Sequence, residues 1–545
     1  MSIKLLNNKI VFYILVVFFA AVAVVVRVHD FGSYPADINC DESMAAVEAM
    51  ALVDNGTDHL GTSYPVYFEA WGHGQMNVLY SYLLTGFLRF FEINTLIVRL
   101  PMLICSLLGI AALTLSSGII FSKEAALFVL AFISINPWHI MQSRWALESN
   151  IFPHFLIFGL AFLWISIYWK QKLLLYISFL FFGLSLYGYG VAYAFVSIFL
   201  FCSVLFFYRS KTFKAVTLCT AIFFFFMVAW PIFLMMYINL FKLPSISVGS
   251  MTIQLFEKTT RTSDILFFSD DKIHQFFSNV RYLWNIIMLQ KMDVWWNQLP
   301  AIGTMYKISL PFSVIGIVKI AQLAMNKNEE GETNYRKICS AILLINLAAS
   351  LFTGLIINNV NVTRMNHIYY PLILVTAYGV YWIFLKSHSL GIFISFCYGI
   401  YFVFFCYRYF YSEDRTFINY TYDQGLEKTL VQASSYQGEL CISTHQYRND
   451  YLITEINTRY LLKLPYSYYS GEMTAEEITA SGYGLSYQER FHYFADLESA
   501  IEQYDDRCVY VVNIRDREIF DKNRFQVKSE GYFSVAVPNS WIPAE

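Results

Sequence analysis

The sequence predicts a mainly α-helical, polytopic membrane protein with a small α/β domain at its C-terminal end. Its 545 residues are 57% hydrophobic and only 14% charged, whereas a soluble domain is about 45–50% apolar and about 25% charged. Apolar runs of spanning length recur from residue 9 to residue 410, and the polar residues beyond them contain no such run. These observations together favour a membrane-embedded bundle followed by a water-exposed domain.

Eleven segments are apolar and long enough to cross a bilayer, which takes about 20 residues. They are 9–28, 95–121, 124–142, 148–169, 173–190, 191–208, 214–238, 304–325, 338–357, 367–386 and 389–410. Basic residues favour the cytoplasmic side, and they precede the first segment and occupy the connectors 170–172, 209–214, 326–337 and 386–387. These basic segments all lie on the same side of the membrane only if a shorter apolar run, 76–91, does not cross it. We therefore expect a helix at the outer interface there.

This topology predicts a membrane domain over residues 1–410 with a cytoplasmic N-terminus. The outer face then carries residues 411–545 and the loops 29–94, 136–150, 239–303 and 358–367. Amphipathic stretches in the loop 239–303 suit either a cover over a site or an interfacial platform. Because most of the unusual polar residues fall in these outer segments, we expect the chemistry outside the cytoplasm. The richness in Phe, Ile, Tyr and Asn is typical of an AT-rich bacterial gene, which indicates a bacterial plasma membrane.

The C-terminal region, 411–545, is predicted to fold as a small α/β domain. Residues 438–444, 508–514 and 532–537 have the composition of strands, and 426–435 and 496–506 have helical periodicity. We find no phosphate loop, nucleophile motif or metal-ligand cluster in this region. Cys441 and Cys508 share this polar region and could form a disulfide. The net charge of −2 says nothing about a nucleic-acid partner, and no basic stripe supports one, so none is expected.

Two acids, Asp41 and Glu42, follow the first apolar segment and begin a stretch with helical spacing that Asn55-Gly56 ends. We expect an amphipathic helix along the outer surface, with both acids at its N-terminal end. Negative charge is favoured there by the helix dipole. Two interpretations stay open: Asp41 caps the helix and Glu42 is a first-turn acid, or the pair performs chemistry.

Further polar side chains gather in the other outer loops. Charges at a membrane mouth are costly unless they are paired or used, although arginines there can also extend toward lipid headgroups. Aromatic residues in these loops suit sugar stacking, and equally the aromatic belt of a membrane protein. The candidates are Glu69, Trp71, His73, Gln75, Trp138, Arg144, Glu148, Arg364, Asn366 and His367.

Four short motifs occur in a fixed order along the membrane domain. They are the acids 41–42 heading a helix, Arg99-Leu100-Pro101 after the run 76–91, Pro137-Trp138-His139 with Ser143-Arg144 and Glu148, and Arg364 with Asn366. Their order and side resemble the GT-C superfamily of membrane glycosyltransferases, and more closely its bacterial protein O-mannosyltransferase and aminoarabinose-transferase branch. The resemblance covers residues 8–390. It departs at 73–75, where His-Gly-Gln replaces the Pro-Pro or Lys-Pro of many members.

The resemblance implies an enzyme that moves a sugar from a polyprenyl-phosphate carrier to the hydroxyl of an extracytoplasmic glycan, lipid or protein. Asp41 inherits the role of general base, with Glu42 as its helper, and the anomeric centre inverts. Arginine binds phosphate oxygens bidentately, so Arg364, then Arg144, are expected on the donor phosphate, with His367 in support. The remaining candidates, Glu69, Trp71, His73, Gln75, Trp138, Glu148 and Asn366, are expected to bind substrate.

Three matters stay open at this stage. Some relatives bind a divalent metal, and this chain has Glu148 but no DxD motif beside it, so a Mg²⁺ or Mn²⁺ ion is neither implied nor excluded. A polysaccharide polymerase or ligase would also place its polar residues outside. A transporter of lipid-linked glycans would carry polar groups near the middle of the membrane, whereas these spans are nearly free of charge.

Overall fold

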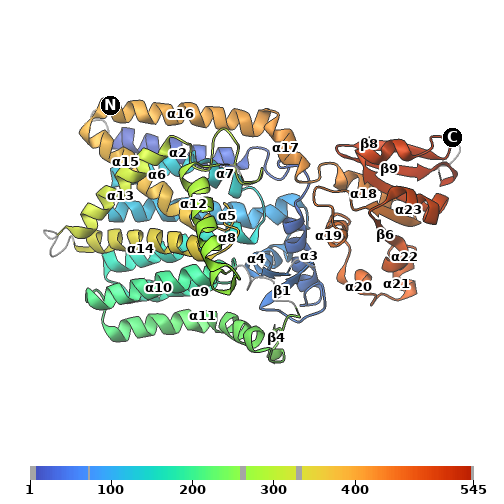
Figure 1. Cartoon of the computed structure of the whole chain (residues 1–545), viewed down its shortest axis with the longest axis horizontal. Coiled ribbons are helices and arrows are strands. Elements are labelled where there is room, and N and C mark those ends of the chain that lie inside the picture. The colour runs from blue at the N-terminus through green and yellow to red at the C-terminus, as the bar shows by residue number, and fades with distance from the viewer. Residues whose placement is uncertain (1–7, 72–73, 258–264, 292, 327–333, 542–545) are drawn as a thin grey trace.

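The structure, a computed structural model, describes residues 8–71, 74–257, 265–291, 293–326 and 334–541. A bundle of long helices occupies most of the molecule, and the C-terminal α/β region sits at one end of it (Figure 1). The helices of the bundle are α2 (Lys9–Val28), α5 (Thr95–Ile120), α6 (Lys123–Ser134), α7 (Pro137–Gln142), α8 (Glu148–Trp169), α9 (Lys172–Ser185), α10 (Ala192–Arg209), α11 (Ala215–Phe241), α13 (Ser309–Met325), α14 (Asn334–Ile356), α15 (Tyr369–Lys386) and α16 (His388–Tyr411).

Every segment expected to span is helical, and eight helices in the described part are long and apolar enough to cross a membrane. The protein is therefore a multi-pass membrane protein. α6, α9 and α13 are shorter, at 12, 14 and 17 residues. The expected span 124–142 is divided into α6 and α7, because Asn136 caps α7 by accepting a hydrogen bond from the backbone of His139. Pro137 then occupies the first turn of α7, where its missing N–H costs nothing.

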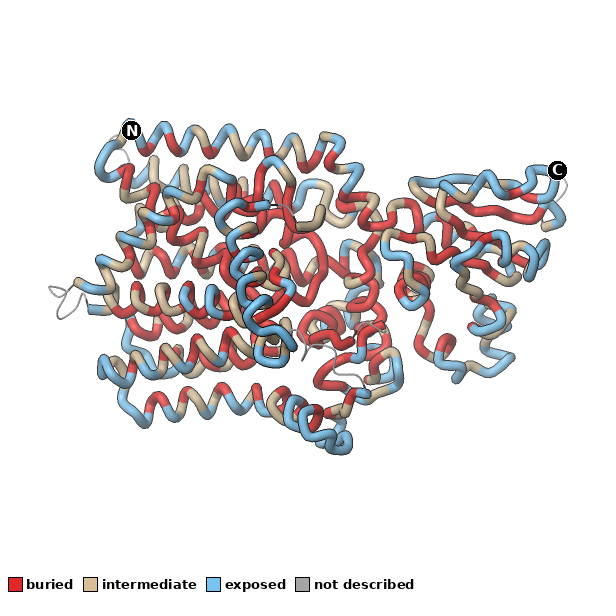
Figure 2. The backbone as a smooth tube through the Cα atoms, viewed as in Figure 1, coloured by how far each residue is buried: buried red, intermediate tan, exposed pale blue. Residues whose placement is uncertain are grey.

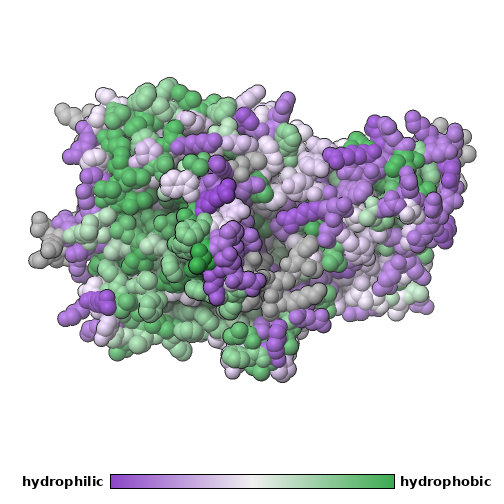
Figure 3. Space-filling view, viewed as in Figure 1, coloured by the Kyte–Doolittle hydropathy of each residue, from purple (hydrophilic) through white to green (hydrophobic). Residues whose placement is uncertain are grey.

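Apolar side chains cover most of the bundle on the face that Figure 3 shows, whereas the C-terminal region is largely polar there. Exposed side chains such as Phe201, Val216 and Phe396 are what a lipid-facing surface requires. Buried residues line the interior and continue into the junction with the C-terminal region (Figure 2). The bundle and the C-terminal region are thus packed against each other.

The basic connectors meet at the end of the bundle away from the C-terminal region (Figure 1). Lys170, Lys172, Lys211, Lys214 and the start of α14 line one cavity of about 370 Å³. The outer loops and the C-terminal region lie at the opposite end. The separation of basic connectors from polar loops, which the topology required, is therefore present.

Between these parts lies a layer of short elements: α3 (Cys40–Asp54), the hairpin of β1 (Tyr67–Ala70) and β2 (Gly74–Asn77), and α4 (Leu79–Leu88). At ten residues α4 is too short to cross, which agrees with the helix expected at 76–91. The helix expected after Asp41 is present, but the expectation that it lies along the surface is wrong. α3 is buried on nearly all sides, because α19 (Tyr451–Leu461) of the C-terminal region packs against it and shares its core.

The C-terminal region contains a five-stranded sheet in the order β6-β5-β7-β9-β8. The expected strands are β5 (Glu439–Ser443), β7 (Cys508–Asn513) and β9 (Phe533–Pro538), and the edge strands β6 (Phe491–Phe494) and β8 (Phe525–Glu530) complete it. β6, β5 and β7 are parallel, and β9 and β8 are antiparallel to their neighbours. One face packs against α18 (Leu426–Ser434) and α19, and the other against α23 (Leu497–Tyr504).

The remaining elements are short. The C-terminal region adds α17 (Asp414–Tyr420), α20 (Tyr466–Tyr469), α21 (Ala475–Ala480) and α22 (Tyr487–Arg490). The third outer loop forms β3 (Ile246–Val248), β4 (Met251–Ile253) and α12 (Lys272–Leu283). α12 lies across the bundle (Figure 1) and exposes Ile273 and Phe277. This exposure favours the interfacial platform over a closed cover.

Candidate active site at the start of α3

The N-terminus of α3 is fixed by a capping box. The Asn39 side chain accepts a hydrogen bond from the backbone of Asp41 (3.1 Å), and Glu42 Oε2 accepts one from the backbone of Asn39 (3.2 Å). The interpretation in which Asp41 caps the helix is therefore wrong, because Asn39 performs that role two residues earlier. Asp41 is the second residue of the helix and is half-buried.

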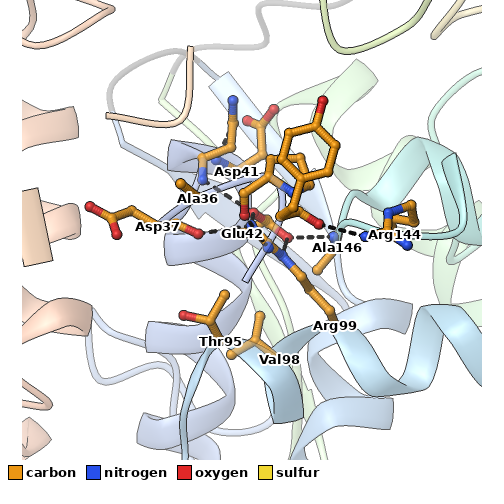
Figure 4. A network of polar contacts seen from close by, with 12 residues as sticks. Ala36, Asp37, Asp41, Glu42, Thr95, Val98, Arg99, Arg144 and Ala146 are labelled. Carbon is orange, nitrogen blue, oxygen red and sulfur yellow. Dashed lines mark hydrogen bonds and ion pairs between the residues drawn. The ribbon is translucent and has the colours of Figure 1, made fainter. Parts of the chain in front are cut away.

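Glu42 lies at the centre of a buried polar cluster (Figure 4). Arg99 donates to both of its carboxylate oxygens at 2.8 Å, and neither side chain is exposed. The backbone of Ala146 also donates to Glu42 Oε1, at 2.7 Å. The first three motifs of the sequence analysis thus converge on one carboxylate. Since its oxygens already accept these hydrogen bonds inside the protein, Glu42 is suited to hold the helix start in place.

Arg99 also fixes the chain that enters α3. Its two terminal nitrogens donate to the carbonyls of Pro35 (2.7 Å) and Asp37 (2.8 Å). With the two bonds to Glu42, the guanidinium ties α5 to both the helix and the segment before it. The position of Asp41 therefore depends on Arg99.

Arg144 and Glu148 occupy structural positions. Arg144 is fully buried and donates to the carbonyls of Arg27 (2.8 Å) and Tyr34 (3.0 Å), with its guanidinium 5.1 Å from the Phe410 ring centroid. In this geometry the two terminal nitrogens hold the end of α2 and the segment after it, and the phosphate contact expected of Arg144 stays a prediction. Glu148 is buried and accepts a hydrogen bond from the backbone of Asn77 (2.5 Å), which ties α8 to β2.

Three further candidates lie in the interior. Trp138 and Asn366 were expected to bind substrate, and His367 to support binding of the donor phosphate. The Trp138 indole donates to Asn366 Oδ1 (2.8 Å), and the Asn366 amide donates to Asn150 (3.0 Å). His367 is fully buried, with its ring 4.6 Å from that of Phe195. Hydropathy placed these residues at the edge of a span, but packing of the helices around them closes them off.

The hairpin β1–β2 brings two candidates together. Glu69 and Gln75 are directly opposite each other across the strands. Glu69 is exposed and Gln75 is buried, and Trp71 at the turn is buried as well. His73 lies outside the described residues. Glu69 is thus the hairpin acid that a substrate can reach.

Arg364 lies in the loop between α14 and α15 and is half-buried. Its guanidinium donates to the Asn358 carbonyl at 2.6 Å. The same loop is tied to the third outer loop, since the backbone of Val362 donates to Asp293 (2.7 Å). Burial raises the pKa of Asp293. Sequence reasoning missed this acid, which is isolated in an apolar stretch.

One more residue that the sequence analysis missed faces Asp41. The exposed Arg448, from the C-terminal region, lies within electrostatic range of Cys40 and Asp41. Its guanidinium also sits 5.9 Å from the ring centroid of Trp296, three residues after Asp293. The candidate site therefore includes a cation from beyond the membrane domain. No local signal marks Arg448, because only the docking of the C-terminal region brings it to α3.

Two acids, the half-buried Asp37 and the buried Asp423, join the C-terminal region to this layer. Asp37 accepts a hydrogen bond from the backbone of Gly425 (2.6 Å), and Asp423 accepts one from the backbone of Tyr447 (2.8 Å). Burial raises the pKa of Asp37 to about 6 and that of Asp423 to about 7. Both carboxyl groups therefore titrate close to neutral pH.

A resident divalent metal does not fit the residues around Asp41. Among the described residues, only Glu439, His492 and Cys508 form a group of three or more side chains whose ligand atoms could share an ion. This group belongs to the C-terminal sheet, so the metal left open beside Glu148 has no ligand set in the described part of the chain. The expectation that the C-terminal region lacks a metal-ligand cluster is also wrong. The three residues of this group lie on three different strands, so no spacing in the sequence reveals them.

No family model and no curated protein matches the sequence. The fold is similar to the crystal structure of ArnT, an aminoarabinose transferase from Cupriavidus metallidurans, bound to undecaprenyl phosphate. The TM-score is 0.56 at 10% identity, over 97% of this chain and 99% of that one. It is also similar to the oligosaccharyltransferase of Archaeoglobus fulgidus in its apo form, with a TM-score of 0.51 at 12% identity over 94% of this chain and 70% of that one. The chain thus has the fold of the GT-C superfamily.

Proposed function

We propose that this protein is a glycosyltransferase that moves a sugar from a polyprenyl-phosphate carrier to an acceptor hydroxyl, with Asp41 as general base. The observation that carries the proposal is the position of Asp41. It is a half-buried carboxylate at the end of a GT-C bundle, between the membrane layer and a polar domain. A lipid-anchored donor reaches that layer from the bilayer, and a polar acceptor reaches it from water.

The reaction breaks the bond between the anomeric carbon and the phosphate oxygen, and forms a bond from that carbon to the acceptor oxygen. The phosphate keeps the electron pair of the broken bond. Asp41 takes the proton of the attacking hydroxyl, a contribution typically of 10²–10⁴-fold in rate. Attack opposite the phosphate inverts the anomeric centre.

Glu42 positions Asp41 in this scheme and does not touch substrate, because it is buried and bound to Arg99. Arg448 and Arg364 are the cations that we assign to the donor phosphate. Arg448 faces Asp41, and Arg364 lies on a loop joined to the segment that carries Trp296. We assign structural roles to Arg144, His367 and Trp138. The solved ArnT structure holds undecaprenyl phosphate, which supports a polyprenyl phosphate as the carrier here.

The orientation follows from charge. The basic connectors gather at the end opposite Asp41, and such connectors favour the cytoplasm. We therefore place Asp41 and the C-terminal region on the extracytoplasmic side, where a glycan, lipid or protein supplies the hydroxyl.

The test is transfer from purified carrier-linked sugars by the purified protein in nanodiscs. Asp41→Asn keeps the shape of the side chain and removes the base, so transfer falls by at least about 10²-fold. Glu92→Gln, an exposed acid after α4, is the control and keeps its activity. Retention of transfer by Asp41→Asn, with the fold intact, would show that another group takes the proton.

A further inference from the structure

Four side chains of metal-binding types share one face of the C-terminal sheet, on three adjacent parallel strands. Glu439 and Cys441 lie two residues apart on the central strand β5, so they point to the same side. Cys508 on β7 pairs with Glu439, and His492 on β6 pairs with Cys441. The register of the sheet, not any sequence spacing, assembles this set.

The side chains are close enough to bind one ion. His492 Nε2 lies 3.0 Å from Glu439 Oε2, and Cys508 Sγ lies 3.8 Å from the same oxygen. Ligand bonds of about 2.0–2.3 Å in a tetrahedron place N and O about 3.3 Å apart and S and O about 3.6 Å apart. The three ligand atoms all lie within 4.8 Å of one another. The thiol of Cys441 is within hydrogen-bonding range of Cys508, but Cys441 is not a member of this group.

Burial is graded across the cluster. The two cysteines are fully buried, whereas the side chains of His492 and Glu439 are 21% and 27% exposed. The thiols therefore sit at the base, and the imidazole and carboxylate form a rim through which an ion can enter. One thiol with one imidazole and one carboxylate is a ligand set for Zn²⁺, whereas Mg²⁺ and Ca²⁺ prefer oxygen alone.

We propose that Glu439, His492 and Cys508 bind one Zn²⁺ ion that joins the three strands. They fill three of the four tetrahedral positions, and a water molecule at the exposed rim would take the fourth. The ion would tie the edge strand β6, which is only four residues long, to β5 and β7. This site is separate from Asp41, and its presence does not depend on the proposed glycosyl transfer.

The two buried thiols offer one competing arrangement, a disulfide between Cys441 and Cys508. Both cysteines are free in the structure. A disulfide would consume the Cys508 sulfur, the one thiol of the ligand group, and abolish the site. The two arrangements therefore exclude each other and give opposite results in the same experiment.

The experiment uses the full-length protein purified without chelator. We expect about one zinc per chain by elemental mass spectrometry. After removal of zinc, added Co²⁺ should give the visible absorption of a tetrahedral ion and a thiolate-to-cobalt band in the near ultraviolet. Cys508→Ser and His492→Ala should each weaken Co²⁺ binding by more than about 100-fold, beyond what loss of an outer-shell partner costs. Cys397→Ser, a half-buried thiol in α16, is the matched control and should bind normally.

A second measurement on the unaltered protein keeps the test decisive if the variants do not fold. Zn²⁺ should protect Cys508 from alkylation, as read by peptide mass spectrometry. A disulfide-linked peptide joining Cys441 and Cys508, or reduced protein that takes up no Co²⁺ at micromolar concentration, would overturn the proposal.

Discussion

The substitution Arg99→Met tests whether the buried ion pair holds the start of α3. The guanidinium makes two hydrogen bonds to Glu42 and two to backbone carbonyls, all at 2.7–2.8 Å, and both side chains are fully buried. Removing one partner of a buried pair leaves a charge without compensation and costs about 3–5 kcal/mol. We expect a loss near 3 kcal/mol, because Glu42 keeps the hydrogen bonds from Ala146 and Asn39.

The double variant Glu42→Gln with Arg99→Met removes both charges together. Replacing a whole buried pair is often close to neutral, so much of the loss should be recovered. The coupling energy should be about 2–3 kcal/mol, the upper part of the range for residues in contact. The assay is the free energy of unfolding from denaturant titration in mixed micelles. Arg209→Met, which removes an exposed arginine at the end of α10, should change that energy by less than about 0.5 kcal/mol.

Additive effects of the two substitutions, or a loss below about 1 kcal/mol for Arg99→Met, would refute this account of the ion pair. A folded Glu42→Gln variant with unchanged stability but no transfer would refute the positioning role in a different way. It would indicate that Glu42 acts directly in the chemistry.

Three further predictions follow from the same layer. Asn39→Ala removes the cap of α3 and should lower the free energy of unfolding by about 1 kcal/mol, whereas Asn39→Asp should not. The folded state holds protons on Asp37 and Asp423 more tightly than the ordinary pKa of 3.8 implies. Their stabilisation is therefore complete below about pH 4 and is lost as the pH rises through 6 and 7. The thermal unfolding midpoint should fall over that window, and Asp37→Asn with Asp423→Asn should flatten the curve. Trp138→Phe deprives Asn366 of its donor and should cost about 1–3 kcal/mol, read as a lower unfolding midpoint, with transfer retained at temperatures where the variant is folded.

The positions of the membrane helices could be predicted from the sequence because burial in lipid is a property of each segment's own composition. The strands β5, β7 and β9 were predictable for a similar reason, since alternation and β-branched residues are local signals. The signals failed where the chain bends within an apolar run. One expected span contains the break between α6 and α7, and Asn136-Pro137 marks it in the sequence.

The candidate site was predictable only in part. Glu42 and Arg99, from the first two motifs, meet in the structure, and the role of Asp41 stays a prediction. The roles of the other candidates were harder to assign, because hydropathy does not distinguish the water-facing end of a helix from a position that other helices cover. Arg144, His367 and Trp138 are interior for that reason.

The sequence by itself therefore determined the class of the protein, the limits of most helices and the acid on which its proposed chemistry depends. Only the tertiary structure decided which side chains meet. Glu42 and Arg99 are 57 residues apart, and Glu42 and Ala146 are 104 apart. Arg448 reaches Asp41 from another domain, and the metal ligands come together from three strands. Composition and periodicity act over a few neighbouring residues, whereas these contacts depend on how whole elements pack, which no local pattern records.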